Sequence, residues 1–135
     1  MFNWFKKLFA KQSDNKLVVA EVTKIEKHPN ADRLRVVELS DGNNIFSPIV
    51  CGAFNFEVGD KVVLALPGAK ISQNIHSETH EPFVLQKAKI RGVESQGMIC
   101  AAFELGLSTD PGQGILVLDK SISTGSKFST NLLKL

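Results

Sequence analysis

Two short segments of this 135-residue chain carry residues suited to binding an anionic ligand. The first is "HPNADR", residues 28–33. Pro29 fixes its own φ and restricts the residue before it, while Asn30 and Asp32 can hydrogen-bond the local backbone. We therefore expect a stiff polar loop that presents Arg33 at its exit. A capped, solvated turn that binds nothing has the same pattern and stays open as the alternative.

The second segment is "LQKAKIRGVESQGM", residues 85–98. On a strand, Lys87, Lys89 and Arg91 would all point to one face, roughly 6.6 Å apart. Three cations in a row repel one another and gain nothing without an anionic partner, and a phosphate backbone is such a partner. The alternative is a solubilising edge strand, because edge strands often use lysine to block aggregation.

The end of this segment, "ESQGM", combines hydrogen-bonding groups with an adaptable apolar side chain. Ser95 and Gln96 offer donors and acceptors, Gly97 permits close backbone approach or a positive φ, and Met98 can adapt to a base or ring. Taken alone, a methionine before "ICAA" is more often a core residue than a ligand contact.

The sequence gives little support for metal binding, catalysis or base stacking by phenylalanines. His76 and His80 lie four apart and would suit zinc on a helix, but the polar segment around them favours a loop, so we expect no metal and no cofactor. No serine lies in a nucleophile-elbow motif, and His28 lies in a turn, so we expect no catalysis. Three phenylalanines could stack on bases as in single-strand binders: Phe46, Phe56 and Phe103. Their apolar settings favour positions in the core instead.

The elements that must position these residues are strands. Alternating apolar residues begin at Leu17, with a phase shift before Ile25 that predicts a bulge. Turn signals separate the runs that follow, so the pattern predicts a compact all-β barrel or sandwich. The expected segments are strands at 34–40, 44–51, 61–68, 83–90, 96–102 and 114–118, a hairpin turn at 41–43, a polar loop at 72–82 and one helical turn at 101–107 closed by Gly106.

Three parts are expected along the chain: residues 1–16, 17–119 and 120–135. The first holds a short amphipathic helix at 1–12 and a polar linker, and so short a helix needs a surface to lie against. That surface could be the domain itself, a second subunit, a protein partner or a membrane. The second is the β domain, and the third is expected to pack on it.

Composition narrows the class of protein. No apolar run of about 18 residues predicts a membrane span, and two cysteines, Cys51 and Cys100, form no disulfide framework, which favours a cytoplasmic protein. A single disulfide between them stays open. Four of the 16 basic residues lie within residues 1–16, which leaves 12 basic and 13 acidic residues in the rest, so nucleic-acid binding requires local clustering.

Five segments taken together resemble the tRNA-binding domain found in the bacterial phenylalanyl-tRNA synthetase beta subunit, in some methionyl-tRNA synthetases and as free-standing proteins. They are "VAEVTKIEKHPNADRLRVVELSDG", "IVCGAFNF", "VGDKVVLALPGAKI", "KAKIRGVESQGMICAAFELGL" and "GILVLD". The likeness covers roughly residues 17–119 and is nearest to the phenylalanyl branch. Phe54 departs from it, because that branch usually has proline after "CGA".

The resemblance implies a five-stranded Greek-key oligonucleotide-binding (OB) barrel that binds tRNA or structured RNA without catalysis. It places Ser95 and Met98 in the tRNA contact, with flanking contacts from Asn30, Arg33, Gln96 and the three cations Lys87, Lys89 and Arg91. Some free-standing members are dimers, so self-association as a homodimer is expected. Nothing here resembles the rest of a synthetase, so we expect no aminoacylation. The competing hypothesis is a scaffold domain without RNA binding that acts through self-association or a protein partner held by residues 1–12.

Overall fold

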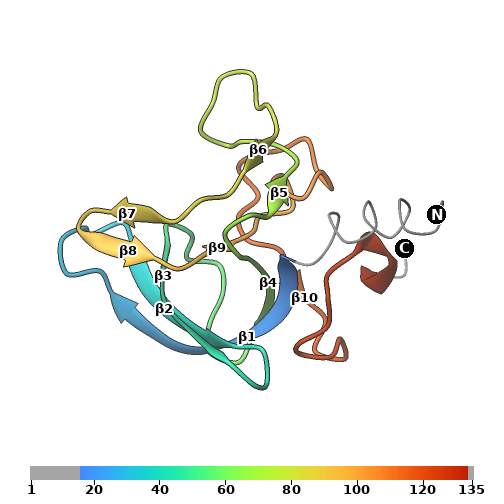
Figure 1. Cartoon of the computed structure of the whole chain (residues 1–135), viewed down its shortest axis with the longest axis horizontal. Helices are drawn as coiled ribbons and strands as arrows, with labels where there is room; N and C mark the ends of the chain where they lie inside the picture. Colours follow the sequence, from blue (N-terminus) through green and yellow to red (C-terminus); the bar gives the residue numbers. More distant parts are fainter. Residues whose placement is uncertain (1–15, 134–135) are drawn as a thin grey trace, which may run out of the picture.

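The computed structural model describes residues 16–133. The helix expected at residues 1–12 lies outside the described residues. The fold is all-β, as predicted, and most of its strands are short (Figure 1). The strands are β1 (Leu17–Lys27), β2 (Arg35–Ser40), β3 (Ile45–Cys51), β4 (Lys61–Ala65), β5 (Lys70–Ile71), β6 (Phe83–Val84), β7 (Ala88–Ile90), β8 (Val93–Ser95), β9 (Met98–Ile99) and β10 (Val117–Leu118), followed by a 3₁₀ helix, η1 (Thr130–Leu133).

The main sheet is antiparallel, with the strand order β10-β4-β1-β2-β3 and with β9 on β4. The long strand β1 pairs with two strands: its first half with β4 and its second half with β2. Its register on β2 shifts between Val22 and Lys24, which confirms the predicted bulge. The bulge lets one strand bend from one side of the molecule to the other.

Hydrogen bonds outside the regular ladders close the sheet into a barrel. The Val50 N–H donates to Ser95 Oγ over 2.9 Å, and the Gln96 N–H donates to the Pro48 carbonyl over 2.9 Å. These bonds join β3 to the segment that leads into β9, and β9 pairs with β4. The OB-like barrel predicted from the sequence is therefore present, although its later strands are broken into shorter pieces than expected.

The interior is filled by the alternating apolar residues that predicted the strands. Val62 to Ala65 of β4 are all buried, in keeping with a central strand. Phe56 and Phe103 are core residues, as expected, and Phe46 packs against the core from a partly exposed position. The helical turn closed by Gly106 is also present, since the Gly106 N–H donates to the Phe103 carbonyl over 3.0 Å and its φ is 77°.

The C-terminal segment pairs with the free side of β1. The Val19 N–H donates to the Ser126 carbonyl over 2.8 Å, and the Phe128 N–H donates to the Leu17 carbonyl over 2.8 Å. Phe128 is only 3% exposed and packs in the apolar cluster on this side of the barrel. The segment thus satisfies backbone groups that would otherwise form an open edge.

Four further features bear on the sequence-based expectations. The strand expected at 83–90 is divided into β6 and β7, and the 3₁₀ helix at the C-terminal end was not predicted. Within the residues that the structure describes, no helix is long and apolar enough to cross a membrane. Cys51 and Cys100 are both buried and free, so the fold does not join them in a disulfide.

We predict that Phe128→Ala lowers the free energy of unfolding by about 3–5 kcal/mol, because it removes a buried ring and leaves a cavity. Urea denaturation measures the change. The exposed Val84, which is 51% accessible, provides the control, and Val84→Ala should change stability by less than about 0.5 kcal/mol. Equal small effects of both substitutions would show that the C-terminal segment does not stabilise the barrel.

Candidate nucleic-acid interface

The imidazole of His28 is the buried centre of the 28–33 loop. Although His28 was expected in a solvated turn, it is 1% exposed. Its Nδ1 accepts the Asn30 N–H over 2.9 Å, so the ring proton is on Nε2, which donates to the Ile90 carbonyl over 3.0 Å. One side chain therefore fixes the shape of its own loop and joins that loop to β7, 62 positions away.

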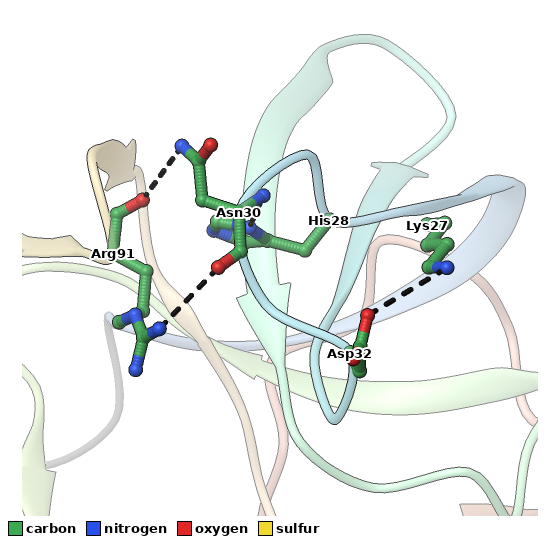
Figure 2. A network of polar contacts seen from close by, with 5 residues as sticks. All are labelled: Lys27, His28, Asn30, Asp32 and Arg91. Atoms are coloured by element: carbon green, nitrogen blue, oxygen red, sulfur yellow. Dashed lines mark hydrogen bonds and ion pairs between the residues drawn. The ribbon is translucent and has the colours of Figure 1, made fainter.

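Asn30 and Arg91 add two more hydrogen bonds across the same contact (Figure 2). Asn30 Nδ2 donates to the Arg91 carbonyl over 3.2 Å, and the Arg91 guanidinium donates to the Asn30 carbonyl over 3.4 Å. Gly92 packs closely here, since a Cβ at that position would lie 3.4 Å from Asn30 Nδ2. The loop and the β7–β8 hairpin thus lie side by side at the end of the barrel where β1 is connected to β2 (Figure 1).

The β7–β8 connection corrects the predicted row of three cations. Arg91 and Gly92 form a two-residue hairpin turn in which both φ values are positive, at 53° and 92°. Only Lys89 of the three cations is within a strand, because Lys87 precedes β7 and Arg91 is in the turn. The expectation of a single strand face carrying all three is therefore wrong, although all three remain exposed close together along the chain.

The exposed cations of this region form a group that we call the cationic rim. It comprises Lys27, Arg33, Lys87, Lys89 and Arg91. Lys27 Nζ is 3.7 Å from Asp32 Oδ1, and both side chains are largely exposed to solvent. This ion pair therefore contributes little to the stability of the fold. Glu94 is directly opposite Lys89 in the β7–β8 pairing and reduces the local positive charge.

Ser95 is a structural residue in this fold rather than an open contact. It is 3% exposed. Its hydroxyl accepts a hydrogen bond from the Val50 N–H over 2.9 Å and donates one to the Gly97 carbonyl over 2.8 Å. Gly97 follows at a point of close approach, because a Cβ there would lie 2.6 Å from the Ala65 carbonyl oxygen. These contacts fix the backbone that presents Gln96 and Met98, both of which are half-buried.

Met98 lies where two hollows meet beside the rim. One hollow has a volume of ≈ 550 Å³ and the other ≈ 410 Å³. They share Val50, His76, Ile90 and Met98 and are therefore adjacent, and we call the two hollows together the groove. Its walls are mainly apolar, which suits the face of a base or ribose better than a phosphate.

Glu104 is the acidic group of this groove. It is 6% exposed, and its Oε1 accepts the Ala101 N–H over 2.8 Å. Burial raises the pKa of Glu104, opposed by the Ala101 N–H and by the charge of His76. Burial also raises the pKa of the Cys51 and Cys100 thiols, which disfavours reactive thiolates.

The segment around His76 and His80 is not helical, so the spacing that would suit zinc does not bring both rings to one helix face. The His80 ring instead packs edge-on against Phe103, with ring centroids 4.9 Å apart. Among residues 16–133, no three His, Cys, Asp or Glu side chains are grouped so as to hold a metal ion.

Sequence reasoning missed the roles of His28 and Glu104. The signal for His28 was a histidine directly before proline in a short loop, but its partner carbonyl is too distant in sequence to predict. Glu104 could have been noticed as a carboxylate within the apolar run "ICAAFELGL". Such a residue is buried only when a hydrogen bond holds it.

Comparison with known proteins decides the family. The model of the family described as "Putative tRNA binding domain" matches residues 17–127. The chain belongs to this tRNA-binding domain family.

Curated relatives agree with the family model. The chain is 42% identical over 122 residues to the phenylalanine–tRNA ligase beta subunit of Chlorobaculum tepidum, and 38% identical over 115 residues to that of Bdellovibrio bacteriovorus. These matches cover 90% and 85% of this chain but only 14% and 13% of the relatives. The chain therefore spans about one seventh of the length of these relatives.

A solved structure supports the fold of this tRNA-binding domain. The crystal structure of a MetRS related protein from Pyrococcus horikoshii superposes with a TM-score of 0.61 at 22% identity, over 92% of this chain and 95% of that chain. Identity at this level shows the shared fold alone. The resemblance stated from the sequence is thus confirmed, and the barrel is the expected one.

We predict that His28→Ala lowers the free energy of unfolding by about 1–3 kcal/mol, because it leaves the Ile90 carbonyl and the Asn30 N–H without their partner. His28→Gln should recover part of this loss, since its amide can still donate to Ile90. Chemical denaturation measures both effects, with the exposed Lys27→Ala as control. An effect of His28→Ala no larger than that of Lys27→Ala would contradict the structural role of the imidazole.

A second prediction concerns pH. The Glu104 carboxyl has its ordinary pKa of 4.5 in the unfolded chain and a higher pKa in the folded protein. Its contribution to the free energy of unfolding therefore falls as pH rises above 4.5 through the folded pKa. Glu104→Gln keeps an acceptor for Ala101 but cannot ionise. Relative to wild type, the variant should gain stability between pH 4 and pH 7.

Urea denaturation at both pH values measures the difference, and Glu94→Gln, at an exposed position, serves as the matched control. If the stability difference between Glu104→Gln and wild type is the same at both pH values, the carboxyl is not held in an environment that disfavours its charge.

Proposed function

We propose that the chain binds tRNA or another structured RNA, without catalysing a reaction on it, through the cationic rim and the groove beside Met98. The observation that carries the proposal is the joining of the 28–33 loop to the β7–β8 hairpin by three hydrogen bonds. This junction gathers cations from two distant parts of the sequence at one end of the barrel. Family membership supports RNA, and tRNA in particular, as the ligand.

The distribution of charge supports an anionic ligand at this end. The cationic rim has five basic residues, and two carboxylates accompany them, Asp32 and Glu94. The remainder of residues 17–135 then holds seven basic and eleven acidic residues. A net charge near neutrality therefore conceals a positive end on an otherwise acidic domain, which would orient a polyanion toward the rim.

The contacts divide by chemistry. Arg33, Lys89 and the other rim cations would hold phosphate oxygens, which positions RNA without reading its sequence. Asn30 donates from Nδ2 within the fold but leaves Oδ1 as an exposed acceptor for a ribose hydroxyl. Gln96 and Met98 would touch a base or ribose at the groove, and Ser95 would hold the backbone beneath them.

The affinity should depend strongly on salt. With four or five phosphate contacts, the logarithm of the association constant should fall with log salt at a slope of roughly −3 to −4.5. Because the loop is already joined to the hairpin before RNA arrives, little ordering of this surface would be needed on binding.

We predict that Lys89→Ala makes this slope shallower by about one unit for every tRNA tested, because it removes one phosphate contact. Fluorescence anisotropy at several salt concentrations gives the slope. Lys120→Ala is the matched control, because Lys120 is also exposed but follows β10, away from the rim.

Glu94→Gln should act in the opposite direction from Lys89→Ala and tighten binding, because it removes the carboxylate opposite Lys89. A slope unchanged by Lys89→Ala would remove this lysine from the binding surface.

A scaffold role is the second candidate, favoured by the small net charge of residues 17–135. In that role the chain would self-associate as a homodimer or hold a protein partner through residues 1–12. Removing residues 1–13 and measuring mass by light scattering and tRNA affinity by anisotropy separates the roles. Loss of the oligomer with no RNA binding in either chain would favour the scaffold role, whereas unchanged RNA affinity would favour the first proposal.

A further inference from the structure

Phe54 is an exposed aromatic ring supported by a cation. It is 58% accessible, although it follows the buried end of β3. The Arg35 guanidinium lies over it, with Cζ 4.7 Å from the ring centroid, and also over the buried ring of Phe56 at 4.6 Å. The two rings thus contact one guanidinium at the start of β2.

The backbone on both sides of Phe54 is held by hydrogen bonds. Arg35 donates to the carbonyls of Ala53 and Phe56, over 3.2 and 3.1 Å. Asn55 donates to the Ile115 carbonyl over 2.9 Å and accepts the Ile115 N–H over 3.0 Å. The exposed ring is thus presented on a rigid segment, so a partner that stacks on it would pay little ordering entropy.

One polar atom of Arg35 is left unsatisfied in this arrangement. Arg35 Nε is buried and has no hydrogen-bond partner. An unsatisfied buried donor is destabilising and uncommon, and one explanation is a functional constraint on the group that carries it. Here that group is the cation beneath the exposed ring.

Phe54 also lies near the end of the cationic rim. A Cβ at Gly52 would be 3.4 Å from Leu34 Cδ2 and 3.8 Å from the Arg33 carbonyl oxygen, so the chain that leads to Phe54 runs beside the exit of the 28–33 loop. Leu34, Gly52 and Ala53 line the larger hollow of the groove. An RNA strand whose phosphates contact Arg33 would therefore have its bases within reach of this ring.

We propose that Phe54 is a stacking platform for an unpaired base of the bound RNA. This rests on the proposed function and extends it from phosphate contacts to a specific base contact. Stacking on an aromatic ring tolerates any base, because every base has a π face, and it requires a base that is not paired. The platform would thus make the domain prefer RNA with unpaired bases to a continuous duplex.

The test uses the full chain, tRNA, and a blunt RNA duplex of about 16 base pairs that offers no unpaired base. Phe54→Ala should weaken tRNA binding about 5- to 100-fold and leave duplex binding and the salt slope unchanged. Val58→Ala is the matched control, because Val58 is also 58% accessible and apolar, and it should bind tRNA as wild type does. Circular dichroism of each variant verifies that the barrel is intact.

A reporter variant tests the contact itself. Trp4 is the one tryptophan of the chain, so Trp4→Phe combined with Phe54→Trp leaves a single indole at the platform. This variant should retain tRNA affinity, and its fluorescence should be quenched by tRNA but not by the duplex. If Phe54→Ala binds tRNA as tightly as Val58→Ala with the expected salt slope, the platform is wrong while the cationic rim stands. If wild type binds no RNA, both proposals are wrong.

Discussion

The candidate surface depends on one buried imidazole. His28 accepts from its own loop with one nitrogen and donates to Ile90 with the other, so the loop and the β7–β8 hairpin are fixed relative to each other. The bonds between Asn30 and Arg91 repeat this connection at the surface, where water competes with them. Without the imidazole, only the two exposed bonds between Asn30 and Arg91 would join the two groups of cations, so more of the rim would have to be ordered when a ligand binds.

The barrel contributes position rather than chemistry. β1 carries Lys27 to one end of the sheet, the tight Arg91–Gly92 turn brings the second set of cations back to that end, and Ser95 ties the following segment to β3. Charge follows this geometry, because the five cations of the rim belong to a domain whose other residues carry more acidic than basic groups. A chain with a small net charge can therefore still present a surface that fits RNA.

The sequence predicted the fold well wherever the signal was local. The bulge before Ile25, the central strand β4 and the buried Phe56 all follow from apolar periodicity and turn residues. It failed where the decisive interaction was distant or conformational. Alternation placed Arg91 on a strand, because periodicity contains no information about a positive φ, and His28 could not be predicted as buried, because its partner is far along the chain. The platform at Phe54 was equally hidden, since only the fold brings Arg35 beneath it.

The central claim is that this end of the barrel binds structured RNA through its phosphates. The most direct measurement is fluorescence anisotropy of the full chain with tRNA, an RNA hairpin and single-stranded DNA at two salt concentrations. The account predicts tighter binding to tRNA than to single-stranded DNA, weakening with salt at a slope of roughly −3 to −4.5. Equal and negligible binding to all three at both salt concentrations would contradict it.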